Sequence, residues 1–311
     1  MPRMLVLVLA ALAASPAAAE GAADFVGNGK ANLDLRYRFE AVEQDDKPES
    51  ADANTLRIRL DLASGEVAGF SGHLQADHIE ALGDPQYDDT RNGQAQYPVV
   101  ADPQGTDLNQ AWLQYRGAKD TVLRLGRQMI SIGNERFVGP VGWRQNEQSF
   151  DAVRLDTRAL PGTSITYAWV DRVMRVFGPD EGMPPAELSS DSHLLDARVT
   201  SLSVGALALY GYHATLHPFQ GWADKFTTTP SAGIEDLYLG VSLKLAGWKC
   251  QAVWHEFEAE ATDARYGSEL DFIVSRRFGE RYEVLAKYAD YRADELFTDT
   301  RKVWLQVSAA F

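Results

Sequence analysis

A strict alternation of apolar and polar residues is the feature that most constrains the fold of this chain. In the stretch LRIRLDL at residues 56–62, leucine and isoleucine fall on one face, and Arg57, Arg59 and Asp61 fall on the other. Successive side chains of a strand point to opposite faces, so a period of two predicts strands with one apolar face. The pattern recurs in fourteen segments, at residues 30–42, 54–64, 69–81, 107–117, 120–129, 149–158, 163–172, 191–200, 203–213, 235–246, 249–258, 266–277, 281–291 and 300–311.

The links between these segments alternate between long and short. Turns such as GAKD (117–120) and FGER (278–281) are short, whereas residues 82–106 and 130–148 form long links, and we also expect a long polar link, QDDKPESADAN, at 44–54. Outer-membrane barrels have tight periplasmic turns and long external loops. In lipid every backbone group must be paired, and closure of the sheet achieves this. The sequence therefore predicts an all-β chain that forms a transmembrane up-and-down antiparallel β-barrel of about 14 strands.

The two ends of the chain predict export to the outer membrane. Residues 1–19 combine a basic start at Arg3 with an apolar run and a small-residue A-x-A ending, which is typical of a cleaved signal peptide. We expect residues 20–311 to form the outer-membrane barrel domain, with outer-membrane lipid as its surroundings. The last segment, KVWLQVSAAF, resembles the signal read by the outer-membrane assembly machinery. The residues that carry this insertion signal are Val303, Leu305, Val307 and Phe311.

Composition excludes several classes of function. The chain has 44 acidic against 30 basic residues, and a nucleic-acid binder would need a basic face. A single cysteine, Cys250, excludes an internal disulfide framework. None of the six histidines lies in a hydrolase or metalloprotease motif, and His73 lies about 6.6 Å along a strand from Ser71, too far for a proton relay. We therefore expect no catalytic residues, no cofactor, no metal site and no nucleic-acid partner.

Basic side chains are frequent on the face opposite the apolar one, which lines the lumen of a barrel. A hairpin centred between Lys47 and Pro48 would place Arg36 opposite Arg59 and Arg38 opposite Arg57. Such residues either attract an anionic solute, as charged rings do in pores, or form ion pairs that stiffen the wall. On this face we predict a pore-lining or selectivity role for Arg36, Arg38, Arg57, Arg59, Arg124, Arg154 and Lys244.

The stretch LRLGRQMISIGNERFVGPVGWRQNEQSFDAVRL, at residues 123–155, resembles the alginate export family of outer-membrane barrels. The resemblance implies a strand, a loop that reaches into the lumen, and a second strand. It also implies a monomeric porin-like channel with arginines at its constriction. The matching residues, for which the resemblance implies a pore-lining or selectivity role, are Arg127, Arg136, Arg144 and Arg154. We expect Trp143 to pack this loop, the third external loop, against the wall. Its structural residues are Gly126, Gly139, Trp143, Phe150 and Asp151.

These observations predict a passive, porin-like channel for an anionic or sugar-like solute, such as a uronate or polysaccharide. The alginate exporter has more strands than 292 mature residues accommodate, which separates this chain from that protein. The alternatives are an outer-membrane enzyme or structural barrel without transport, and a soluble periplasmic β protein that binds polyanions.

Overall fold

The computed structural model describes residues 24–133, 135, 138–199, 207–209, 220–227 and 229–311. The predicted signal peptide at 1–19 lies outside the described residues. All fourteen predicted segments overlap a strand. These strands are β1 (Lys30–Gln44), β2 (Ala51–Ala63), β3 (Phe70–Ala81), β4 (Gly105–Ala118), β5 (Thr121–Gln128), β6 (Ser149–Thr157), β7 (Thr163–Met174), β8 (Glu187–Val199), β9 (Leu207–Leu209), β10 (Glu235–Leu245), β11 (Trp248–Glu258), β12 (Arg265–Phe278), β13 (Tyr282–Ala293) and β14 (Thr300–Ala310).

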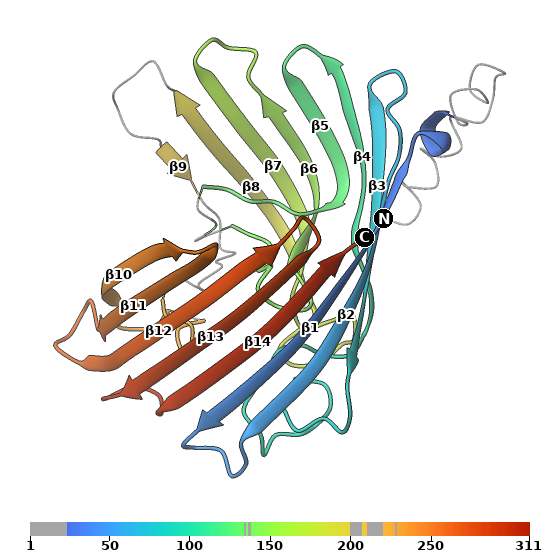
Figure 1. The fold of residues 1–311 in the computed structure, drawn as a ribbon. Helices are drawn as coiled ribbons and strands as arrows, with labels where there is room; N and C mark the ends of the chain where they lie inside the picture. Colours follow the sequence, from blue (N-terminus) through green and yellow to red (C-terminus); the bar gives the residue numbers. More distant parts are fainter. Residues whose placement is uncertain (1–23, 134, 136–137, 200–206, 210–219, 228) are drawn as a thin grey trace.

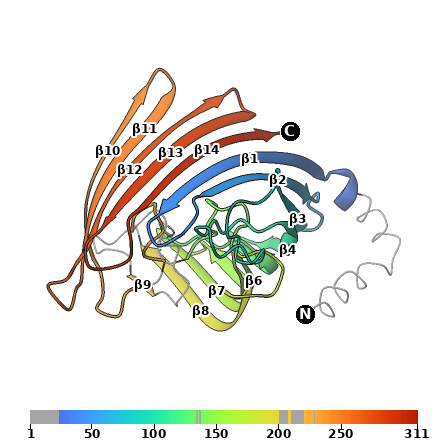
Figure 2. The ribbon, with the colours of Figure 1, turned by 90° about the horizontal axis from the view of Figure 1, so that it is seen from below.

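The strands form one antiparallel sheet in which sequence neighbours are spatial neighbours. Its order is β10-β11-β12-β13-β14-β1-β2-β3-β4-β5-β6-β7-β8-β9, so the first and last strands pair with each other. The wall curves around inner segments of chain (Figures 1 and 2). Within the described residues no pairing joins β9 to β10, and the two edges of the sheet lie there. This is the predicted up-and-down topology.

The strands whose side chains the structure describes separate an outward, mainly apolar face from a lumen face, as the alternation predicts. On β14, Leu305 is 49% exposed on the outer face, whereas its neighbour Trp304 is fully buried on the lumen face. Val303 and Val307 share the outer face with Leu305 and lie opposite the outward residues Ala41 and Tyr37 of β1. Apolar side chains that are exposed outside and polar side chains buried inside identify the outer face as the one that meets lipid.

The register of the first hairpin differs from the expected one by two residues. Arg36 lies opposite Arg57, Arg38 opposite Thr55, and Asp34 opposite Arg59. The observed register places one opposite-charge pair directly across the strands, which is more favourable than two pairs of arginines. A shift of two keeps every side chain on its predicted face.

Several external links are much longer than the periplasmic turns, but three of them, at 45–50, 259–264 and 294–299, have six residues each, as many as the turn at 64–69. The link between β1 and β2 comprises only residues 45–50, because both strands continue beyond their predicted ends. The links at 82–104 and 129–148 are long, and the turns at 119–120 and 246–247 have two residues each. In the described part of the chain, no helix has the length and apolar character needed to cross a bilayer.

The assignment of the two faces can be tested on neighbouring strands. Phe272, in the middle of β12, is 45% exposed on the outer face, and Gln251 of β11 lies on the lumen face opposite Ile273. We predict that Phe272→Arg lowers the free energy of unfolding by about 2–4 kcal/mol, the cost of arginine near the bilayer midplane. Gln251→Arg, the matched control, should change it by less than about 0.5 kcal/mol. Urea unfolding from liposomes measures both values, and equal costs would contradict the assignment.

Candidate functional site

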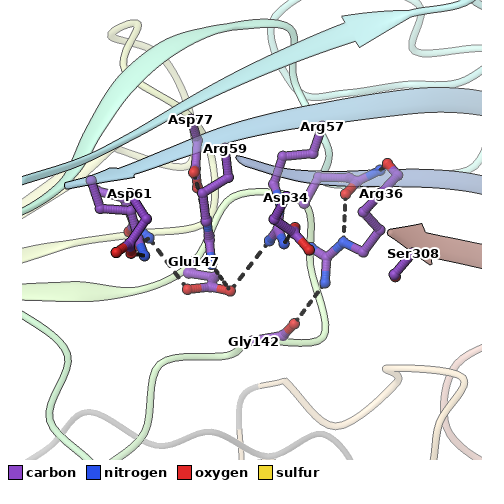
Figure 3. Close-up of polar contacts among 12 residues, drawn as sticks. Asp34, Arg36, Arg57, Arg59, Asp61, Asp77, Gly142, Glu147 and Ser308 are labelled. Carbon is purple, nitrogen blue, oxygen red and sulfur yellow. Dashed lines mark hydrogen bonds and ion pairs between the residues drawn. The ribbon is translucent and has the colours of Figure 1, made fainter. Parts of the chain in front are cut away.

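The third external loop, residues 129–148, folds into the lumen and lies against β1 and β2. Arg144, Gln145, Asn146 and Gln148 are all buried there. Figure 3 shows arginines of both strands pointing toward this loop. The inward-reaching loop implied by the family resemblance is therefore present, and we call it the constriction loop.

Arg36 binds the constriction loop through neutral acceptors. Its Nε donates to Gln145 Oε1 at 2.8 Å and its Nη1 to the carbonyl of Gly142 at 3.1 Å. Its Nη2 donates to the carbonyl of Arg144. Among the described residues Arg36 forms no ion pair, so only neutral acceptors bind its guanidinium directly.

Arg57 and Arg59 share one carboxylate of the constriction loop. Glu147 Oε1 lies 3.3 Å from Arg57 and 3.0 Å from Arg59 (Figure 3). Arg57 also pairs with Asp34 at 2.7 Å, and Arg59 binds both oxygens of Asp77 at 2.7 and 2.6 Å. Burial opposes ionisation of Glu147, but the two guanidiniums outweigh it and hold the pKa of this carboxyl below its usual range.

Arg38 connects the wall to the second external loop, residues 82–104. It pairs with Asp102 at 3.0 Å, and both side chains are at most 1% exposed. The other oxygen of Asp102 accepts the backbone N–H of Gln145 at 2.8 Å, which joins the second loop to the constriction loop. Burial opposes ionisation of Asp102, yet Arg38 and Arg144 keep the pKa of this carboxyl below its usual range.

Arg144 connects the constriction loop to the wall and to a third inner segment, residues 220–227. It lies 3.1 Å from Glu40 of β1 and 2.9 Å from Asp224. Asp224 also pairs with Lys302 of β14 at 3.2 Å. Burial lowers the pKa of Arg144, but Glu40 and Asp224 outweigh burial and raise it above its ordinary value. The sequence analysis did not predict that this segment enters the lumen. The available signal was a pair of apolar aromatic residues, Trp222 and Phe226, within a polar link.

Three tryptophans surround the ammonium group of Lys287 on β13. Its Nζ lies 4.0 Å from the Trp143 ring, 4.2 Å from that of Trp222 and 4.9 Å from that of Trp304. Trp143 and Trp304 also meet edge to face at 5.4 Å. Cation–π contacts of this kind are stronger when desolvated. Trp143 of the constriction loop thus packs against the buried cluster that contains Trp304 of the wall.

Of the other predicted pore-lining residues, three face the lumen and one cannot be placed. Arg124, Arg154 and Lys244 face the lumen, since their register partners include Gln114, Ala168 and Lys249 on the same face. Arg136 lies outside the described residues.

Arg127 is placed differently from its prediction. It shares a face of β5 with Leu123 and Leu125 and lies opposite Ala111 and Asp151, so it points away from the lumen. The prediction of a pore-lining Arg127 is wrong in its placement, because β5 keeps a regular register through Gly126 and positions 124 and 127 therefore have opposite parity.

Most of the structural residues predicted for the constriction loop lie in the strands at its two ends, and Gly139 lies within it. Gly126 has φ of 120°, a conformation that glycine adopts readily. The carbonyl of Gly139 accepts a hydrogen bond from Gln148 at 2.9 Å, and Phe150 is fully buried beside Ile130 and Val138. Asp151 forms an ion pair with Arg127 at 2.9 Å on the outer face rather than supporting the loop inside.

The histidine considered for catalysis has a structural partner. His73 Nε2 lies 2.9 Å from Asp61 Oδ2, and the imidazole meets Trp112 edge to face at 5.0 Å. Asp77, which shares its strand face, is bound to Arg59. These contacts hold strands β2, β3 and β4 together.

Comparison with known proteins agrees with this architecture. Residues 30–177 match the family model described as alginate export. No curated protein matches the sequence.

Solved structures share the fold at low sequence identity. Acinetobacter baumannii OccAB2 is 12% identical with a TM-score of 0.69, covering 93% of this chain and 99% of its own. Pseudomonas aeruginosa OccK9 (OpdG) is 14% identical with a TM-score of 0.67, covering 92% and 100%. The P. aeruginosa outer membrane protein OpdK is 13% identical with a TM-score of 0.64, covering 92% and 99%. The chain therefore has the fold of outer-membrane porin barrels.

The link between the constriction loop and residues 220–227 yields a prediction. Asp224→Asn removes the shared carboxylate of Arg144 and Lys302, and a buried charged hydrogen bond contributes about 1.5–3 kcal/mol. We expect the undocked state of the loop to become about tenfold or more populated, with larger and noisier single-channel conductance in planar bilayers. Asp263→Asn, in the exposed link after β11, is the matched control. Identical traces for the Asp224 variant and wild type would refute the role of this contact.

Glu147 yields a prediction about pH. Because its pKa is lowered in the folded protein, its stabilisation is present above the ordinary value of 4.5 and is lost only as the pH falls through the lower folded pKa. Wild-type conductance should therefore stay constant from pH 7 down to about pH 4.5. Glu147→Gln should give at pH 7 the altered conductance that wild type shows only in stronger acid. Glu43→Gln, which removes a carboxylate that is 65% exposed, should change nothing. A wild-type transition above pH 5 would contradict the assignment.

Proposed function

We propose that this outer-membrane barrel, which matches the alginate export family model over residues 30–177, is a porin-like channel through which a small anionic solute diffuses down its gradient. The observation that carries the proposal is a pair of arginines, Arg124 and Arg154, directly opposite each other on the lumen face of β5 and β6. Like charges across strands are unfavourable unless water, carboxylates or an anionic ligand compensate them.

Compensation at this pair is incomplete. Arg154 pairs with Asp156 at 2.8 Å. Arg124 has only neutral contacts among the described residues, with Gln114 at 2.8 Å and the Trp112 ring at 4.2 Å. Three residues separate Arg124 from the two-residue turn at 119–120, near the periplasmic mouth. A net positive charge on a confined lumen wall raises the local concentration of anions.

The inner segments that occupy the lumen favour a small solute over a polymer. Three inner segments, at 82–104, 129–148 and 220–227, meet in the lumen through Asp102, Arg144 and Asp224. P. aeruginosa OpdK, which has the same fold, has been crystallised with vanillate, a small aromatic carboxylate. A small carboxylate, including a sugar acid such as a uronate, fits both the charge and the restricted lumen. Passage of this kind is passive and involves no catalysis.

The last strand supports a proposal about assembly. Val303, Leu305 and Val307 form an outward apolar row on β14, and both backbone groups of Phe311 pair with Leu33 at 2.9 and 3.0 Å. The Phe311 ring meets Tyr282 edge to face. We propose that the outer-membrane assembly machinery recognises this strand, after export by the signal peptide at 1–19.

Reversal potentials in planar bilayers under a salt gradient test the anion preference. The double variant Arg124→Gln with Arg154→Gln should lower the ratio of anion to cation permeability by about fivefold, since a unit charge at 4 Å in water contributes roughly 1 kcal/mol. The effect should shrink at high ionic strength. Arg127→Gln is the matched control, because this arginine lies on the same strand but faces outward.

Two results would overturn the proposal. Wild-type protein that shows no conductance after verified insertion would remove the channel function. An equal permeability ratio in the double variant and wild type would remove the selectivity role of these arginines while leaving the channel intact.

A further inference from the structure

A short N-terminal segment lies outside the barrel, against the outer wall. Residues 24–27 form one helical turn that lies beside β2 and β3 and outside the curved sheet (Figures 1 and 2). The backbone N–H of Gly65, in the turn after β2, donates to the carbonyl of Phe25 at 2.8 Å. The segment is thereby held at the end of the barrel that carries the short turns, which is the periplasmic end.

An apolar groove of about 530 Å³ opens between this segment and the wall. Its floor consists of outward residues of three adjacent strands, among them Leu62, Leu74 and Leu113. The register confirms their orientation, because Leu62 lies opposite Leu74 whereas the adjacent Asp61 lies opposite Gln75 on the lumen face. Phe25 and Val26 form the opposite wall of the groove.

The Phe25 ring lies against the backbone of Gly72. Gly72 lies on the outer face opposite Leu113, and a Cβ at this position would stand 3.2 Å from the nearest Phe25 ring carbon. A larger side chain at position 72 would displace the ring and fill the groove. The absence of a side chain therefore lets the N-terminal segment approach the wall while leaving room beside it.

We propose that this groove binds one acyl chain of a phospholipid of the periplasmic leaflet. The groove is continuous with the lipid-facing wall, where Leu60 and Leu74 are 45% and 50% exposed, so its open side meets hydrocarbon. Val26 is 76% exposed beside the groove and extends the same apolar surface. A membrane-embedded apolar groove has a ready occupant in the acyl chains around it. The inference concerns the outer wall and does not depend on the transported solute.

Binding of this kind gives the N-terminal segment a function. A chain held between Phe25 and the wall ties the first residues of the described barrel to one leaflet. The lipid and the Gly65–Phe25 hydrogen bond together fix the segment at the periplasmic interface. The groove is thus a specific lipid site, in contrast to the exchangeable contacts along the remaining wall.

Native mass spectrometry of the full protein, released from detergent with added palmitoyl-oleoyl phosphatidylethanolamine, tests the proposal. Wild type should retain one phospholipid per barrel. Gly72→Leu, which fills the groove, and Phe25→Ala, which removes one wall, should each retain it roughly tenfold less, as expected from losing contacts to several methylene groups. Ala197→Leu introduces the same leucine side chain on the outward face of β8, away from the groove, and should retain lipid like wild type.

Folding of each variant is verified by heat-modifiable gel mobility. If Gly72→Leu fails this check, Phe25→Ala still tests the proposal, because it changes no strand residue. Equal retention in wild type, Gly72→Leu and Phe25→Ala would overturn the proposal, as would equal loss in Ala197→Leu. A wild-type dimer without lipid that Phe25→Ala dissociates would assign the groove to a second copy of the chain instead. Channel conductance should be the same in all these variants, which separates this test from that of the proposed function.

Discussion

The inner structure of this barrel depends on the pairing of wall arginines with carboxylates from the inner segments. Arg38, Arg57 and Arg59 are buried on the lumen face, and desolvated charges are unfavourable unless they are paired. Their partners Asp102 and Glu147 come from two different loops, and Arg144 reaches outward to Glu40 in return. Removing one partner of a buried pair costs about 3–5 kcal/mol. The wall therefore holds the loops, and the loops make the charged wall stable.

The strands and their faces were predictable from the sequence because the period of two is a local property. Leu56, Ile58 and Leu60 define an outer face without reference to any other strand, and this fixes the lumen position of Arg57 and Arg59. The same parity places Arg127 with Leu125 on the outer face. The prediction of Arg127 as pore-lining came from the family resemblance and contradicted the local pattern, and the local pattern was right.

The partners of the arginines were not predictable because they are distant in sequence. Arg144 is 104 residues from Glu40 and 80 residues from Asp224. No pattern within a strand or loop encodes such a contact, since it arises only after the wall has curved and the loop has entered it. The two-residue error in the first hairpin has a similar cause. Parity fixes a face, but the choice among registers of equal parity depends on charges across the strands, here Asp34 and Arg59.

This pairing separates two uses of arginine along the lumen. Where Glu147, Asp102 and Glu40 neutralise the guanidiniums, the charges contribute shape and stiffness and little net field. Arg36 differs because neutral acceptors hold it, and Arg124 differs because it stacks on Trp112 instead of pairing. The anion preference proposed above therefore rests on these few arginines and not on the total number of basic residues. A chain with 44 carboxyl side chains can still present a locally positive path. Its carboxylates neutralise most of the lumen arginines where they lie, and the few arginines with neutral contacts supply the positive charge.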